Sequence, residues 1–172
     1  MRSMPPLRSS GVSSRTDSVR GADSWYGLSE AQVALRLGRR LGLRWAPGGL
    51  IGYGAKPDAR VELAPGTWVM LEVERGQHHP AANVLKYWPW LEGTRTRLVL
   101  VHAIAPDASK RHGPRTDLAV WTGDKMQREL RGRFAYCRVE LGTDREARDM
   151  QRARAAIAAF GTPGQVPTER EP

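Results

Sequence analysis

The clearest pattern in the chain is an alternation of apolar and polar residues in two neighbouring segments, 57–63 and 68–74. Such alternation, with a period of two, is typical of β-strands that have one buried face. Between them lies Ala64-Pro65-Gly66, which has the length of a hairpin loop and carries glycine where a left-handed backbone is needed. The pattern therefore predicts an antiparallel hairpin.

The apolar residues also set the register of this hairpin. Pairing Leu63 with Thr67 puts the apolar residues of both strands on one face, whereas a slip of one residue would mix the faces. In this register Asp58 lies opposite Glu72, and Glu74 follows on the same face about 7 Å along the strand. Like charges placed opposite each other destabilise a sheet. The carboxylates therefore predict a cation site, and a divalent metal bound by all of them is the simplest candidate.

The segment 28–43 is predicted to form a helix in front of the hairpin. Ser29 and Gln32 have the spacing of a capping box, which satisfies the first amide groups of a helix. Glu30 then falls in the first turn, where a carboxylate either suits the helix dipole or joins a metal site. An apolar stripe at helical spacing should face the core: Val33, Leu37 and Leu41. Arginines off this stripe are predicted to contact nucleic acid: Arg36, Arg39 and Arg40.

A second helix is predicted after the hairpin, with Pro80 in its first turn and Pro89 kinking or ending it. Helical spacing directs one set of its residues towards the core: Val84, Trp88 and Leu91. A neighbouring side carries polar and aromatic residues: Asn83, Lys86, Tyr87 and Trp90. Aromatic residues here and near the N-terminus, such as Trp25 and Tyr26, either stack on nucleic-acid bases or belong to the core. Trp88 is assigned to the core.

The rest of the chain predicts further strands and helices. The segment 97–103 is nearly continuous in apolar residues, as expected of a central strand that is covered on both faces. A further helix and a strand over 134–141 follow. Thr143 and Glu146 have the spacing of a second capping box, and the last helix is expected to stop at Gly161.

Length and composition indicate one domain with two tails. The 172 residues suffice for a sizeable core, expected over 24–160. Residues 1–23 are rich in Ser and Arg and lack an apolar segment, so they predict a disordered basic arm and not a secretory signal. A flexible tail is expected over 161–172. The chain has no apolar run near the eighteen residues of a membrane span, and a cytoplasmic location is predicted. The single cysteine, Cys137, excludes an internal disulfide and a cysteine-based zinc cluster.

The charge balance points to a polyanionic partner. The formal net charge is +9 and the isoelectric point is about 10.5, which favours nucleic acid. Arginine far outnumbers lysine, which either suits bidentate contacts to phosphate or reflects the base composition of the gene. Only the first interpretation bears on function, and the second does not explain the net charge. Further candidate contacts to nucleic acid follow the hairpin: Arg75, His78 and His79. Adjacent histidines make a poor zinc chelate.

The order of these elements, together with Pro57-Asp58 and Glu72-Val73-Glu74, resembles the PD-(D/E)XK nuclease superfamily. The resemblance covers residues 24–141 as an arrangement but only a short motif. It implies an α/β fold with a restriction-endonuclease-like core, in which helices flank a mixed four- to five-stranded sheet in the order αβββαβ. It also implies an endonuclease that hydrolyses phosphodiester bonds with Mg²⁺, for which Mn²⁺ is expected to substitute.

The superfamily pattern has a lysine where this chain has Glu74. Members that resemble this chain in carrying Glu-x-Glu either use the second Glu directly or draw a lysine from the next helix. Lys86, one turn after Asn83, is placed for the second option. Lys56 is a rival, because the predicted register puts it opposite Glu74. A plain cross-strand ion pair is the alternative explanation for Lys56.

The resemblance implies that Asp58 and Glu72 bind the metal and that Glu74 either binds it too or orients the attacking water. Lys86 would then contact the scissile phosphate. The first hypothesis is therefore a nuclease acting on DNA, with RNA left open. The alternative is a nuclease-fold protein whose catalysis has decayed, acting as a nucleic-acid-binding or structural component of a larger nucleoprotein assembly. A homodimer is also left open.

Overall fold

The computed structural model describes residues 24–76 and 79–161, apart from the side chains of 107–114, and these residues form one mixed five-stranded sheet. The strands lie in the sheet in chain order: β1 (Ala46–Pro47), β2 (Ala59–Ala64), β3 (Thr67–Glu74), β4 (Arg97–Ile104) and β5 (Phe134–Glu140). The pairs β1–β2 and β2–β3 are antiparallel, whereas β3–β4 and β4–β5 are parallel. The predicted α/β class and mixed sheet are confirmed.

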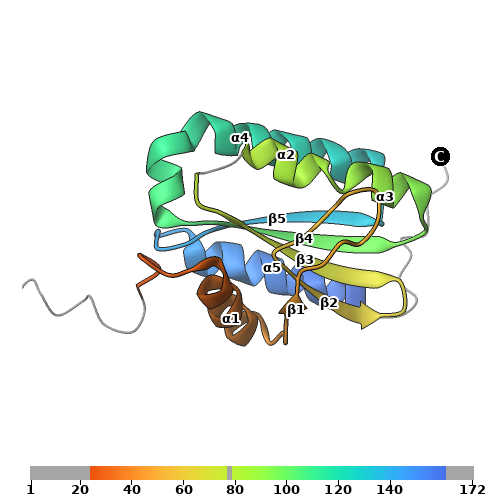
Figure 1. Ribbon diagram of the computed structural model, residues 1–172, viewed down its shortest axis with the longest axis horizontal. Coiled ribbons are helices and arrows are strands. Elements are labelled where there is room, and N and C mark those ends of the chain that lie inside the picture. The colour runs from red at the N-terminus through yellow and green to blue at the C-terminus, as the bar shows by residue number, and fades with distance from the viewer. Residues whose placement is uncertain (1–23, 77–78, 162–172) are drawn as a thin grey trace, which may run out of the picture.

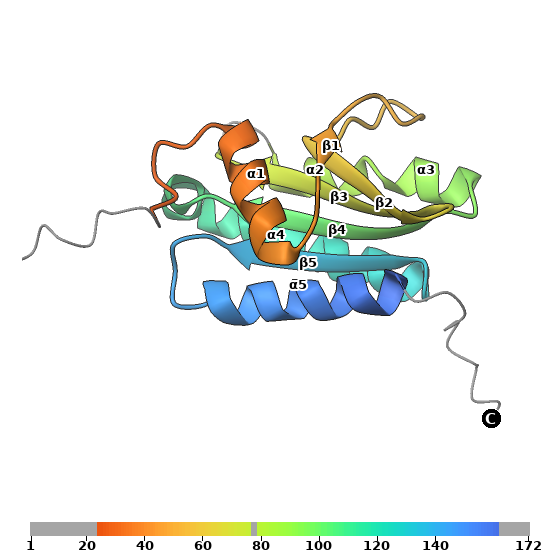
Figure 2. The same ribbon diagram turned by 90° about the horizontal axis from the view of Figure 1, so that it is seen from below.

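Helices cover both faces of this sheet (Figures 1 and 2). Their bounds are α1 (Glu30–Leu41), α2 (Pro80–Leu85), α3 (Trp88–Gly93), α4 (Pro106–Glu129) and α5 (Glu146–Gly161). Helices α2, α3 and α4 lie over one face, and α1 and α5 lie over the other. The predicted basic arm lies outside the described residues, as does the predicted tail after Gly161.

The alternation along the strands divides the core into two apolar layers. Val69, Leu71 and Val101 belong to the layer beneath α1 and α5. Met70 and Leu100 belong to the layer beneath α2, α3 and α4. Strand β4 is buried along nearly its whole length, which confirms that it is central and covered on both faces.

The predicted hairpin register is confirmed along the strands and wrong at the loop. Ala59 pairs with Leu71 and Val61 with Val69, as the apolar pattern requires. At the loop, however, Thr67 pairs with Ala64 and not with Leu63, because the register shifts there. A bulge takes up the extra residue, so that a tighter turn joins the strands without moving the buried faces.

The first helix begins and ends two residues inside the predicted 28–43, at Glu30 and Leu41. Its Ser29–Gln32 capping box is confirmed, and its stripe of Val33, Leu37 and Leu41 is buried. Gly42 ends the helix in the left-handed conformation, with φ of 71°.

The second predicted helix is divided in two. Helix α2 ends at Leu85 and α3 begins at Trp88, with Pro89 in the first turn of α3. This break changes which aromatic residues face the core: Tyr87 and Trp90 are buried, and Trp88 is only half-buried. Trp88 packs against the core as predicted but only in part, and the deeper burial of Tyr87 and Trp90 was not predicted, because the helix breaks at Lys86 and Tyr87, before Pro89.

The capping box predicted for the last helix does not form. Helix α5 begins at Glu146 itself, so Glu146 is not in the third helical position. The Thr143 hydroxyl accepts from the Arg145 amide, and the Glu146 carboxylate accepts from the Gly142 amide. Glu146 also accepts from the Trp25 indole, which ties the start of the described chain to α5.

Gly123 brings α4 into direct contact with the ring of Tyr136 on β5. A Cβ at this position would lie 2.3–2.6 Å from three ring atoms. We expect Gly123→Ala to destabilise the protein by about 1–3 kcal/mol through overpacking, although alanine is otherwise favoured over glycine in a helix by about 1 kcal/mol. Urea denaturation measures the difference. The exposed Asp124→Ala serves as the control, and a stabilised Gly123→Ala protein would contradict the contact.

Candidate active site at the ends of the parallel strands

Strand β3 carries two carboxylates near its end, on the face covered by α2 and α3. Glu72 and Glu74 alternate with Met70 of the apolar layer, so the strand period directs all three to the same side. Both carboxylates are buried, with exposures of 2% and 1%. Asp58 lies just before β2, is exposed, and is close enough for its charge to act on Glu72.

The buried Glu72 carboxylate is held by two consecutive residues between α2 and α3. Lys86 Nζ lies 2.8 Å from Glu72 Oε2 in a salt bridge, and the Tyr87 hydroxyl donates to Glu72 Oε1. Lys86 Nζ also donates to the backbone carbonyl of Lys56 at 2.9 Å. The predicted direction of Lys86, towards the side of Glu72, is therefore confirmed.

Lys86 and Tyr87 lie at the junction between α2 and α3. Lys86 and Tyr87 keep helical backbone angles, so their side chains leave the backbone about 100° apart. The Glu72 carboxylate lies between these two side chains. One of its oxygens accepts from Lys86 and the other from Tyr87. Lys56, the rival of Lys86, is exposed and takes part here through its backbone.

Asp58 is fixed to β3 by both its backbone and its side chain. Its amide donates to the Leu71 carbonyl at 3.0 Å, and its Oδ2 accepts from the Val73 amide at 2.7 Å. These bonds continue the hairpin ladder by one step beyond β2 and place Asp58 beside Glu72, in the predicted register. Within the described part of the chain, Asp58 Oδ1 accepts no hydrogen bond.

Glu74 is directed towards the connection between β3 and α2. It accepts from the Gly76 amide at 2.7 Å and from Asn83 Nδ2 at 3.3 Å. Among the described residues, no group of three or more carboxylates, histidines or cysteines is placed to hold a metal ion. The expected three-carboxylate cluster of Asp58, Glu72 and Glu74 is therefore not formed, because hydrogen bonds to the turn orient Glu74.

Burial dominates the electrostatics of Glu72. Removal from water raises the pKa of Glu72 from 4.5 to about 7, although Lys86 and the Tyr87 hydroxyl stabilise the charged form. Asp58 raises this pKa further, as a neighbouring negative charge does. Burial, and then the charge of Glu72, also raises the pKa of Tyr87, which therefore stays a neutral donor.

His102 is a buried polar residue that the sequence analysis missed. It pairs with Glu72 in the β3–β4 ladder, is fully buried, and lies 2.9 Å from the Tyr136 hydroxyl through Nδ1. Burial, then the charges of Arg138 and Lys86, lower the pKa of His102 to about 3. The imidazole is thus neutral. Its only sequence signal was a polar residue inside an apolar run.

Tyr87 was considered only as an aromatic surface for bases or as core. In the structure its ring belongs to the apolar layer, while its hydroxyl reaches Glu72. The signal that could have identified it is its place directly after Lys86 in the predicted helix.

Several predicted contacts to nucleic acid are used inside the fold. Arg36 donates to the Ser24 carbonyl, Arg40 pairs with Glu146, and Arg75 donates to the Leu28 carbonyl. Arg36 and Arg40 also stack on the buried ring of Trp25.

Three other predicted site residues are exposed: Glu30 in the first turn of α1, Arg39 on α1, and His79 just before α2. Glu30 makes none of the hydrogen bonds that hold Asp58, Glu72 or Glu74 in the described chain. His78 lies outside the described residues.

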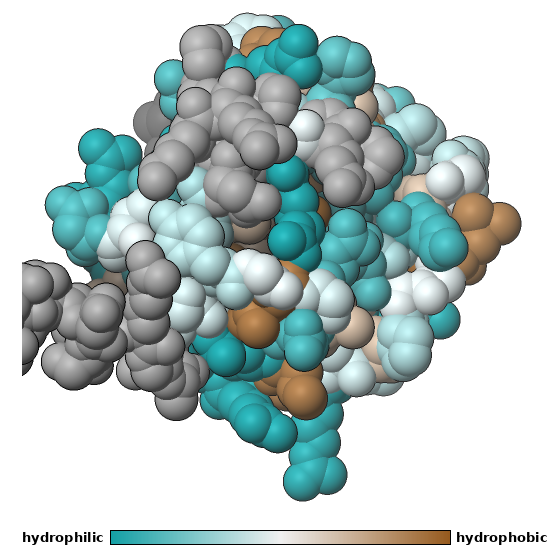
Figure 3. All heavy atoms as spheres, turned by 60° about the vertical axis from the view of Figure 1, so that its left-hand side comes forward, coloured by the Kyte–Doolittle hydropathy of each residue, from teal (hydrophilic) through white to brown (hydrophobic). Residues whose placement is uncertain are grey.

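The surface at the side turned forward in Figure 3 is mainly hydrophilic, with small apolar patches.

The chain matches no model of a protein family, no curated protein and no solved structure. Within the described residues, no helix combines the length and the apolar character that crossing a membrane requires. The geometry of the site itself therefore carries the functional argument.

The raised pKa of Glu72 predicts that stability depends on pH. The folded protein binds this proton more tightly than the unfolded chain, so the contribution is complete below pH 4.5 and is lost as pH rises through about 7. At 1.36 kcal/mol per pH unit, the loss is about 3 kcal/mol. Urea denaturation from pH 4 to 8 should show this loss in the wild type, and Glu72→Gln should lack it. The exposed Glu92→Gln is the control, and identical profiles for all three proteins would refute the assignment.

Proposed function

We propose that this protein is a metal-dependent nuclease that hydrolyses DNA phosphodiester bonds, with Asp58, Glu72 and Lys86 at its active site. The observation that carries the proposal is the 2.8 Å salt bridge between Lys86 and the buried Glu72, beside Asp58. A lysine ammonium next to paired strand carboxylates supplies the charges that phosphoryl transfer requires.

The arrangement of elements supports the same proposal. A helix, an antiparallel three-strand segment, a helical connection and a parallel strand follow one another as α1, β1–β3, α2–α3 and β4. This is the αβββαβ order implied by the resemblance to the PD-(D/E)XK superfamily. We therefore propose a restriction-endonuclease-like core.

The residues present fit one Mg²⁺ ion held through few protein ligands. Mg²⁺ commonly keeps several waters and binds one or two carboxylates. Asp58 Oδ1 accepts no hydrogen bond in the described chain, and Glu72 lies near it on the neighbouring strand β3, so these two would hold the ion. When bound, the ion would neutralise phosphate charge and activate a water molecule.

Lys86 would take the role that the superfamily pattern gives to the residue at Glu74. Glu74 is bound to Gly76 and Asn83, whereas the Lys86 side chain, which is 26% exposed, lies against Glu72. It would stabilise the negative charge that develops on the scissile phosphate. Tyr87 is a positioning residue, because its hydroxyl fixes the second oxygen of Glu72.

The second candidate is a nuclease-fold protein without catalysis that binds nucleic acid or serves in a nucleoprotein assembly. The observation that favours it is the missing convergence of Glu74 with Asp58 and Glu72 among the described residues. Both candidates use the net charge of +9 to bind a polyanion. Calorimetric titration with Mn²⁺ separates them, because only the nuclease requires binding that Asp58→Ala removes.

Cleavage of supercoiled plasmid in Mg²⁺ or Mn²⁺ tests the residue roles. We expect Asp58→Ala and Glu72→Ala to abolish cleavage. We expect Lys86→Ala to lower the rate by about two orders of magnitude or more, the usual effect of losing one transition-state contact, with little change in DNA affinity. Lys56→Ala is the matched control and should cleave at nearly the wild-type rate.

Circular dichroism of each variant shows whether it is folded. Folded Asp58→Ala or Glu72→Ala protein that nicks plasmid at the wild-type rate would refute the active site. An effect of Lys56→Ala as large as that of Lys86→Ala would refute the special role of Lys86.

A further inference from the structure

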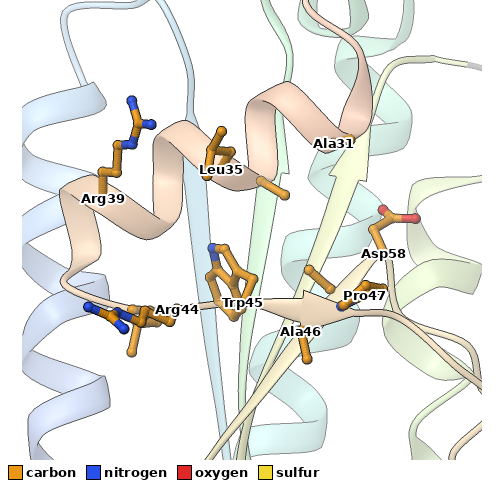
Figure 4. Close-up of a pocket in the computed structure, with 11 residues that line it drawn as sticks. Ala31, Leu35, Arg39, Arg44, Trp45, Ala46, Pro47 and Asp58 are labelled. Atoms are coloured by element: carbon orange, nitrogen blue, oxygen red, sulfur yellow. The ribbon is translucent and has the colours of Figure 1, made fainter.

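A groove of about 540 Å³ runs between α1 and β1 and reaches the active-site residue Asp58 (Figure 4). Its walls are mainly apolar: Ala31, Ala34 and Leu35 from α1, and Leu43, Trp45 and Pro47 from the segment leading through β1. The groove and the proposed active site therefore share one residue, Asp58.

Gly38 allows the Trp45 ring to lie against α1. A Cβ at Gly38 would come within 2.6 Å of Trp45 Cδ1 and 2.8 Å of the Leu43 carbonyl oxygen. Any larger residue would push Trp45 away from the helix. The half-buried ring thus forms part of the groove between the two walls, as Figure 4 shows.

The two ends of the groove differ in charge. Asp58 lies at the end next to Ala31, and Arg39 and Arg44 lie at the opposite end (Figure 4). Both arginines are exposed, and within the described chain neither side chain has a hydrogen bond or an ion pair. Arg39 comes eight positions after Ala31 on α1, which corresponds to about 12 Å along the helix axis.

We propose that this groove binds an unpaired strand of DNA leaving the active site, an inference that rests on the proposed nuclease function. Apolar walls with one indole ring suit the faces of bases and sugars, and the two free arginines suit phosphates. A cavity of this size accommodates one drug-sized ligand, comparable to one or two nucleotides, and is too small for a duplex. The preferred substrate is then DNA with a single-stranded end or gap.

Charge favours this occupant over a second copy of the chain. A copy carrying the same net charge of +9 would meet the arginine end with like charge, whereas a phosphate backbone is complementary to it. The continuity with Asp58 also favours a substrate strand, because the scissile phosphate must lie at that end.

Fluorescence anisotropy in EDTA tests the proposal without cleavage. The probes are a fluorescein-labelled oligothymidylate and a blunt duplex of the same length, each titrated with the full-length protein over a range of salt. Wild-type protein should bind the single strand more tightly than the duplex. Arg39→Ala/Arg44→Ala should lower the salt slope for the single strand by about 1.4, or about 0.7 for each lost phosphate contact.

Two further variants sharpen the test. Arg128→Ala/Arg131→Ala removes the same charge from exposed arginines elsewhere and should leave the slope unchanged. Ala31→Trp places a ring in the groove from an exposed helix position and should weaken single-strand binding by about fivefold or more, the effect of losing one base contact.

Wild-type protein without a preference for the single strand would overturn the proposal. So would groove variants that behave like the control, or that alter sedimentation as a self-association surface would. Because anisotropy measures binding without cleavage, the groove proposal and the proposed nuclease function can be refuted independently. If the protein does not cut plasmid but the groove variants weaken single-strand binding as expected, the nuclease function is refuted and the single-strand binding site stands.

Discussion

Burial of the Glu72 carboxylate is the constraint around which this end of the fold is organised. An ionised carboxylate with an exposure of 2% is costly unless both oxygens have donors. The donors, Lys86 and Tyr87, are supplied where α2 stops and α3 begins. The junction between α2 and α3 therefore lies over Glu72.

The apolar pattern was sufficient to predict the hairpin and the place of its charges. Alternation fixes which residues pair, since only one register puts Val61 opposite the buried Val69 on the core face, and that register brings Asp58 beside Glu72. The direction of Lys86 was also predictable, because helical spacing separates it from the buried Val84. These successes share one cause: each depends on local periodicity.

The errors arose where long-range contacts decide the outcome. Pro89 signalled an interruption, but only packing against the sheet determines that Tyr87 and Trp90 are buried in preference to Trp88. Glu74 has the spacing of a third ligand, yet a turn amide and Asn83 orient it elsewhere. His102 was hidden in an apolar strand, because burial next to Glu72 follows from the neighbour of that strand and not from its own sequence.

The bond from Lys86 to the Lys56 carbonyl gives the ammonium an anchor that does not titrate. If Glu72 were its only partner, protonation of the carboxylate near pH 7 would release the side chain. With a peptide oxygen as second acceptor, the cation keeps its place in both ionisation states. The Lys86 side chain therefore ties the junction of α2 and α3 to the segment leading into β2 through a bond that does not depend on the charge of Glu72.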